Sequence, residues 1–180
     1  MPAPEPTAAT PPPPGAELRL RPARDDDGGA IGALIAGVFA DYPGCVFEPA
    51  EFPELAAPAT AFAAGGGRLW VIEDPARSGV AGSFGILQSP EPGIFTLHKV
   101  YLAAELRGRG LAGRLLAEAT AFARAAGGTE LRLWTDTRFA AGHRFYEKNG
   151  FVRAPLVRFL ADASDSWEFA YRRPLGGGVQ

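Results

Sequence analysis

A segment rich in glycine and arginine, Arg107–Gly113 (RGRGLAG), has the residue types and spacing of an anion-binding site. It follows an apolar, strand-like run at 94–102 and opens a segment with helical apolar spacing at 109–126. The first turn of a helix leaves backbone N–H groups without partners and carries the positive end of the helix dipole. The three glycines would let a ligand approach that backbone closely, and the two arginines add positive charge. We therefore expect this segment to hold phosphate.

The three glycines, Gly108, Gly110 and Gly113, also fit the pattern G-x-G-x-x-G of dinucleotide-binding folds. That pattern is weak evidence by itself, because the fingerprint needs its first glycine immediately after a strand. Here the apolar run ends near Leu102, several residues earlier, and the sequence contains one strand–helix–strand unit. A P-loop is excluded because no Gly-Lys-Ser/Thr ends the segment. A surface helix that merely begins with glycine and arginine is the third interpretation.

Length and composition indicate one globular domain with a tail before it. The chain has 180 residues, of which 47% are hydrophobic, enough to bury a core. Residues 1–16 are rich in proline and alanine and contain almost no large side chains, so we expect a disordered tail. Residues 17–180 are expected to form a single domain.

Apolar periodicity and turn residues divide that domain into strands and helices. Three runs separated by turns predict an antiparallel meander, and the long connection through the main helix predicts a parallel neighbour for its last strand. Asp25–Asp27 are expected to cap the first helix, and Asp136 or Thr137 the last one. The expected strands lie near 18–20 and at 68–73, 80–88, 94–102, 131–135, 151–160 and 166–173, and the expected helices follow residue 27 and lie at 53–64, 109–126 and about 137–149.

Charge and rare residues narrow the classes of function. The formal net charge of -2 gives no electrostatic footprint for nucleic acid, and no apolar run is long enough to cross a membrane. Cys45 is the single cysteine, and His98 and His143 are the only histidines, so we expect no metal site. The first residues lack the features of a secretory signal, which makes a cytoplasmic protein the default expectation.

Two blocks of sequence resemble one enzyme superfamily. The first is Leu97–Leu102 followed by Arg107–Ala112, which resembles the signature R/Q-x-x-G-x-G/A of the GNAT superfamily of acetyl-CoA-dependent N-acetyltransferases. The second, Leu133–Phe139 and His143–Phe151, resembles that superfamily's second block. The order of elements agrees over about residues 17–175. The resemblance implies an acyl-CoA N-acyltransferase-like α/β (α+β) fold, with a mixed, mostly antiparallel central sheet, a parallel splayed pair and helices on both faces.

The resemblance also implies where acetyl-CoA, the acyl donor, would bind. The pyrophosphate would sit on the signature loop, and the pantetheine arm would pair with the free edge of a strand that separates from its neighbour. Separated strands leave N–H and C=O groups that need partners, which gives this arrangement a physical basis. The implied cofactor-binding residues are Val100, Tyr101, Leu102, Arg107, Gly108, Arg109, Gly110, Leu111, Ala112 and Gly113.

Tyr146 occupies the position of the family's general acid by resemblance. A phenol of pKa about 10 could protonate the departing thiolate if it were well positioned. Its alternative role is packing beside neighbouring aromatic residues. Thr96 stands where some members carry a glutamate base, and His98, expected on the same strand face as Thr96, Val100 and Leu102, is a candidate base or a structural histidine. His143, one helical turn before Tyr146, is assigned no role.

The acceptor is expected to be an amine of a small molecule or peptide. The stretch after the first helix is acidic and aromatic, which suggests a small cationic amine; its residues are Asp41, Tyr42, Phe47, Glu48, Glu51, Phe52 and Glu54. Phe139 stands where many members have a cofactor-binding asparagine, and Ala112 replaces a frequent glycine. A monomer or homodimer is expected. Two other classes stay open: a non-catalytic acyl-CoA-binding domain and a dinucleotide-dependent oxidoreductase.

Overall fold

A computed structural model describes residues 17–75 and 79–176, and the predicted tail at 1–16 lies outside these residues. The described chain forms a seven-stranded sheet in the order β1-β2-β3-β4-β5-β7-β6. No helix within the described ranges is long and apolar enough to cross a membrane. The strands are β1 (Arg19–Pro22), β2 (Arg68–Asp74), β3 (Gly79–Gln88), β4 (Ile94–Leu102), β5 (Glu130–Asp136), β6 (Val152–Phe159) and β7 (Trp167–Pro174). The α-helices are α1 (Gly28–Ala40), α2 (Pro58–Ala64), α3 (Leu111–Ala125) and α4 (Ala140–Lys148), and short 3-10 turns are η1 (Asp25–Asp27), η2 (Pro49–Glu51), η3 (Pro53–Ala56) and η4 (Ala104–Leu106).

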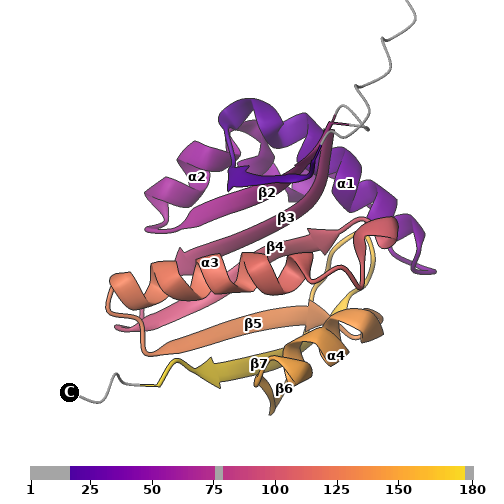
Figure 1. Ribbon diagram of the computed structural model, residues 1–180. Helices are drawn as coiled ribbons and strands as arrows, with labels where there is room; N and C mark the ends of the chain where they lie inside the picture. The colour runs from indigo at the N-terminus through magenta and orange to yellow at the C-terminus, as the bar shows by residue number, and fades with distance from the viewer. Residues whose placement is uncertain (1–16, 76–78, 177–180) are drawn as a thin grey trace, which may run out of the picture.

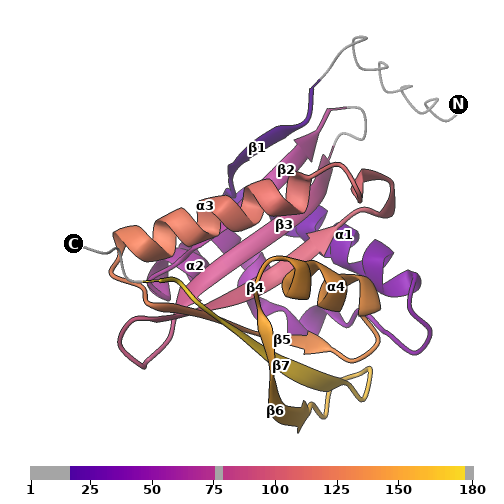
Figure 2. The ribbon, with the colours of Figure 1, turned by 60° about the horizontal axis from the view of Figure 1, so that its bottom comes forward.

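The sheet is antiparallel except for one pair. Strands β1 to β4 form an antiparallel meander, β4 and β5 run parallel, and the β6–β7 hairpin joins through β7 to β5. Helices α3 and α4 lie on one face of the sheet, and α1 and α2 lie on the other (Figure 1, Figure 2). The predicted fold class is confirmed, including the parallel pair on either side of the main helix.

Helix α3 is held to the sheet by the apolar stripe that its sequence predicts. Its buried residues join the largest core cluster, together with Phe95 of β4 and Leu131 of β5. The helix begins after Gly110, whose φ of +76° favours glycine, and Gly127 with φ of +77° follows its end. The buried residues of the helix are Leu111, Leu115, Leu116, Ala119 and Ala123.

Both predicted helix caps are wrong, because the aspartates have other partners. Asp27 stands at the N-cap of α1 without capping it, and its carboxylate instead binds the guanidinium of Arg21 at 2.7 Å. Helix α4 begins after Phe139, and Asp136 binds Arg138 at 2.6 Å. Each carboxylate also accepts the backbone N–H of an arginine that precedes the helix, so all of its hydrogen bonds go to partners outside the first helical turn.

Strand β4 contains an irregularity that changes which side chains share a face. Lys99 has a φ of +50°, and the register with β3 shifts between Ser83 and Gly85. The ring of His98 packs edge-on against Phe62 of α2. Tyr101, three residues later, packs against Phe39 of α1, which lies on the same face of the sheet (Figure 1). The expectation that Thr96, His98, Val100 and Leu102 share one face is therefore wrong beyond the bulge.

Candidate active site

Strands β4 and β5 are paired only at one end. Within the described chain they share three register pairs, which join Ile94–Thr96 to Glu130–Arg132. Beyond Thr96 the strands separate, and Figure 2 shows α4 in front of the region between them. The edge of β4 from Leu97 to Leu102 is thus left without a ladder partner on the β5 side, as expected for the splayed pair.

A cavity of about 250 Å³ lies where the strands separate, between β4, α3 and α4, and we name it the α4 cavity. Three consecutive residues of β4 line it, as do the loop before α3 and the buried face of α4. These lining residues include Val100, Tyr101, Leu102, Arg107, Gly108, Ala112, Thr135, Phe139, Phe145 and Tyr146. The structure therefore brings together the β4 residues, part of the glycine loop and the tyrosine that the sequence predicts as site residues.

The glycine loop leaves open space in front of its backbone. Gly108 and Gly110 have φ of +75° and +76°, and a Cβ at either position or at Gly113 would meet no protein atom within 4 Å. Gly108 and Gly110 are thus required by their backbone conformation rather than by packing. The amides of Leu111 and its two successors, in the first turn of α3, have no helical acceptor and open onto that space.

The two arginines of the loop differ in how they are held. The guanidinium of Arg107 donates to the carbonyl of Leu102 and pairs with Asp41, both at 3.3 Å, so it fastens the loop to β4 and to the end of α1. Arg109 is exposed. Its side chain is therefore available to a ligand on the surface of the loop.

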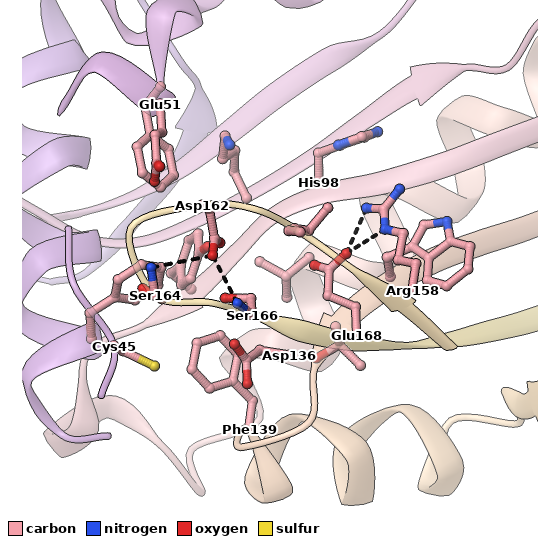
Figure 3. Close-up of a pocket in the computed structure, with 18 of the residues that line it drawn as sticks. Cys45, Glu51, His98, Asp136, Phe139, Arg158, Asp162, Ser164, Ser166 and Glu168 are labelled. Atoms are coloured by element: carbon pink, nitrogen blue, oxygen red, sulfur yellow. Dashed lines mark hydrogen bonds and ion pairs between the residues drawn. The ribbon is translucent and has the colours of Figure 1, made fainter. Parts of the chain in front are cut away.

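A second cavity, of about 580 Å³, lies on the far side of β4, and we name it the hairpin cavity (Figure 3). Its walls come from β4, from the β6–β7 hairpin and from the segment that follows α1. The lining residues include Cys45, Glu51, Phe52, Thr96, His98, Lys99, Trp134, Arg158, Phe159, Leu160, Asp162 and Glu168. It thus combines residues that are more than 100 positions apart in the sequence.

Tyr146 lines both cavities, and so do Val100, Tyr101, Thr135 and Phe139. The side chain of Tyr146 is buried, yet among the described residues its hydroxyl has no hydrogen-bond partner. Because every fully buried polar side-chain atom there does have a partner, this hydroxyl opens onto the cavity space. Burial raises the pKa of the Tyr146 phenol, which therefore keeps its proton at neutral pH. The proton of this phenol thus lies at the junction of the two cavities.

Tyr101 is a second, partly buried phenol at the same junction. Its ring lies edge-on to Phe39 at 5.9 Å, and burial raises its pKa as well. The sequence predicted only its backbone as part of the site. The side chain reaches the junction because the bulge at Lys99 turns it toward α1, which no strict two-residue period anticipates.

His98 faces the hairpin cavity but is poorly suited to be a base. Its burial, with Lys99 beside it, lowers the pKa of the imidazole to about 4, so the ring is neutral and weakly basic at pH 7. Thr96 lines the same cavity. His143 is structural: its Nε2 lies 2.9 Å from the carbonyl oxygen of Asp136, and its ring stacks on Tyr171.

The acidic stretch after α1 does not form one binding surface. Glu51 and Phe52 line the hairpin cavity, whereas Tyr42 lines the α4 cavity. The remaining carboxylates are engaged elsewhere. Asp41 pairs with Arg107, Glu54 with Lys99 at 2.6 Å, and Glu48 accepts a hydrogen bond from the amide of Ala50 at 3.2 Å.

The main polar group of the hairpin cavity escaped the sequence interpretation. Arg158 of β6 and Glu168 of β7 are register partners, and their side chains meet at 2.6 Å (Figure 3). The guanidinium of Arg158 lies over the ring of Trp134, 4.4 Å from its centroid. Their sequence spacing carries no motif, and only a correct β6–β7 register would have paired them.

Two loops far apart in sequence are joined beside this cavity. The amide of Val46 donates to the Oγ of Ser164 at 2.8 Å, and the amide of Ala163 donates to Glu51 at 2.7 Å. Arg138 donates to the carbonyl of Gly44 at 2.9 Å. These bonds fix the segment after α1 against the β6–β7 connection and so define one side of the cavity.

A family model described as an acetyltransferase (GNAT) domain matches residues 65–153. The match runs from the turn before β2 to the start of β6, and it includes β4, the glycine loop, α3 and α4. The chain belongs to the GNAT family of acetyltransferases. It is therefore an acyltransferase, and its fold is one that takes an acyl-CoA co-substrate. The dinucleotide interpretation of the three glycines is wrong, because they lie in a GNAT domain whose sheet has one parallel pair of strands.

Solved structures of similar fold cover nearly all of this GNAT protein. A GNAT-family acetyltransferase of Staphylococcus aureus Mu50 superposes with a TM-score of 0.76 at 16% identity, covering 89% of this chain and 100% of that one. An acetyltransferase of Streptococcus agalactiae gives 0.73 at 20% identity, with 87% and 98% covered. A GNAT-family acetyltransferase of Streptococcus pneumoniae gives 0.67 at 22%, with 89% and 100% covered. At these identities the likeness establishes the fold. No curated protein sequence matches the chain.

The described residues contain no group of three or more histidine, cysteine, aspartate or glutamate side chains that could hold a metal ion. The arrangement can instead supply a proton donor between two cavities, a helix N-terminus for an anion and an unpaired strand edge for an extended ligand.

Proposed function

We propose that this protein transfers an acetyl group directly from acetyl-CoA to a primary amine. The observation that carries the proposal is the Tyr146 hydroxyl, which is unpartnered within the described chain and lines both cavities where β4 and β5 separate. In this proposal the α4 cavity takes the donor and the hairpin cavity takes the acceptor.

Donor binding uses backbone groups for the most part. The diphosphate accepts hydrogen bonds from amides between Gly108 and Gly113 at the N-terminus of α3, because the amide of Arg107 already donates to the carbonyl of Ala104. Arg109 adds charge from the surface. The pantetheine arm pairs with the free edge of β4 at Val100, Tyr101 and Leu102, which supplies the partners that β5 does not. Phe139, in place of an asparagine, contributes an apolar wall.

The transfer itself needs one proton donor. The amine nitrogen attacks the thioester carbonyl carbon, the C–S bond then breaks, and the departing thiolate takes the proton of Tyr146. The proton that the amine nitrogen loses on becoming an amide returns the phenolate to a phenol, so atoms and charges balance. Burial raises the pKa of the Tyr146 phenol and so weakens it as an acid, which means that the proton transfer depends on the position of the hydroxyl beside the departing sulfur.

The test is thiol release from acetyl-CoA with a panel of amines. Tyr146→Phe should lower kcat by about 100-fold or more and leave the KM for acetyl-CoA unchanged. Tyr171→Phe is the matched control, since its phenol donates to Glu147 and lines neither cavity; its activity should be unchanged.

Three other outcomes contradict parts of the proposal. Acetyl-CoA binding without thiol release for any amine would favour the non-catalytic acyl-CoA-binding alternative. A silent Tyr146→Phe would remove Tyr146 as the acid, and a large loss in Tyr101→Phe instead would move that role to the second phenol at the junction.

A further inference from the structure

The Arg158–Glu168 pair leaves one group of each side chain open. Both Nε and Nη2 of Arg158 donate to the same oxygen, Oε2 of Glu168, at 2.6 Å (Figure 3). Within the described part of the chain, the Arg158 Nη1 and the Glu168 Oε1 have no partner. A cross-strand pair that served structure alone would gain more from the fork-to-fork contact, which uses both oxygens.

The guanidinium is also held in a fixed place. It lies 4.4 Å from the centre of the Trp134 ring, and the side chain of Arg158 is 45% exposed where that of Glu168 is only 16% exposed. Stacking and the Glu168 contact restrict the guanidinium, so little entropy is lost when a further anion binds. Both side chains line the hairpin cavity, so the open groups are available to an acceptor.

The other charged groups of this cavity are already engaged. Lys99 pairs with Glu54 at 2.6 Å and lies over the ring of Phe52. Asp136 gives both oxygens to Arg138. Glu51 accepts a backbone N–H from the β6–β7 connection, and Asp162 accepts two backbone N–H groups within its own loop. Arg158 is thus the best-placed cation for an incoming carboxylate.

The size and the remaining walls of the cavity fit a small molecule. Its volume of about 580 Å³ lies within the usual range for small-molecule sites. Part of the cavity wall is apolar and includes Phe52, Phe159 and Leu160. A ligand that matches these walls has opposite charges at one end and an apolar group at the other.

We propose that the acceptor is an α-amino acid with an apolar side chain, whose carboxylate binds the open face of Arg158 and whose amino group lies beside Glu168. This proposal rests on the proposed function and specifies its substrate class. An α-amino acid carries its two charged groups on one carbon, and the cavity presents the complementary charges on adjacent strands at directly opposed positions.

The experiment compares matched acceptors that differ only in the carboxylate. L-phenylalanine is paired with 2-phenylethylamine, and L-leucine with 3-methylbutylamine, in a thiol-release assay with acetyl-CoA. The wild-type kcat/KM should favour each amino acid by about 10- to 100-fold, the range for a hydrogen-bonded charge pair. Arg158→Met should bring the ratio to about one or below, and Arg158→Lys should give an intermediate ratio, because lysine keeps the charge but loses the planar fork.

Arg153→Met is the matched control. Arg153 lies on the same strand, stacks on Phe169 at 3.2 Å and lines neither cavity, so its loss should leave the ratio unchanged. The ratio is internal to each variant, so a general loss of activity does not imitate the expected result. Circular dichroism of each variant establishes that it is folded.

Binding without turnover separates this proposal from the proposed function. The binding of L-phenylalanine to the protein saturated with CoA is measured by calorimetry. Binding that Arg158→Met abolishes supports the amino acid site even if no thiol is released, in which case the proposed function alone fails. Equal use of amines and amino acids, a ratio that Arg158→Met does not change, or neither binding nor turnover of amino acids would overturn the proposal.

Discussion

The two cavities on either side of β4 are built in different ways. The α4 cavity is bounded mostly by a short continuous stretch, from β4 through the glycine loop into α3, and by α4, with smaller contributions from β3 and the end of α1. The hairpin cavity takes its walls from the segment after α1, from β4 and from the β6–β7 hairpin, which are joined by hydrogen bonds over 112 and 118 residues. The first cavity thus takes much of its wall from one stretch of the chain, whereas the second takes its wall from separate segments that folding brings together.

This difference follows from the chemistry that each side offers. The α4 cavity presents backbone amides and a strand edge, which many sequences can supply if glycine permits the conformation. The hairpin cavity presents side chains, above all Arg158 and Glu168, whose identity decides what can bind. In the proposed function, backbone groups would bind the acyl donor, and side chains would select the acceptor.

The largest expected effect concerns the glycine loop beside the α4 cavity. The double variant Gly108→Ala, Gly110→Ala forces two alanines into positive φ, which should destabilise the fold by about 1–2 kcal/mol per position. Lost amide contacts should also raise the KM for acetyl-CoA about 10-fold or more. Urea unfolding and initial-rate kinetics measure the two effects.

Gly127→Ala is the control for backbone strain. Gly127 has a φ of +77° and an equally open surrounding, but it lies at the other end of α3. Its replacement should cost the same stability per position and leave the KM unchanged. An equal rise of KM in both variants would show that strain, and not donor contact, explains the effect.

The second prediction concerns the partly buried imidazole on the hairpin side. Because the pKa of His98 falls from 6.5 in the unfolded chain to about 4 in the fold, the unfolded chain binds a proton between these values that the folded chain does not. Stability should therefore fall as the pH drops below 6.5, by on the order of 2–3 kcal/mol near pH 4.

His98→Gln should remove this part of the pH dependence. Urea unfolding of both proteins at pH 7, 5.5 and 4 isolates the contribution of His98 as the difference between them. Curves that fall in parallel would mean that His98 is not buried in its neutral form, and would make it a base candidate again.

The smallest expected effect distinguishes two glutamates of the acidic stretch after α1. Glu51 lines the hairpin cavity, so Glu51→Gln should raise the KM for a positively charged amine by up to about 5-fold, as expected for a partly screened charge. Glu48 caps its own turn outside the cavity, and Glu48→Gln should leave the KM unchanged. Initial-rate kinetics with one amine suffice, and equal effects would contradict the assignment of this wall.

The elements whose signals are local were predictable. The apolar stripe of α3, the antiparallel order of β2, β3 and β4 and the glycines before α3 each depend on residues close together in the sequence, and the structure confirms them. The caps failed because the carboxylates of Asp27 and Asp136 bind arginine side chains and backbone amides that lie outside the expected helices. The prediction of which β4 side chains share a face was wrong because a bulge at Lys99 shifts the alternation of the strand before Tyr101.

The sequence by itself determined the family, the fold class and the loop at the entrance of α3, because helix termini and glycine conformations depend on neighbours along the chain. The tertiary structure alone decided that Tyr146 lines two cavities, that His98 is partly buried and that Arg158 meets Glu168. Burial, dielectric surroundings and cross-strand register depend on residues far away in the chain, so no local pattern contains them.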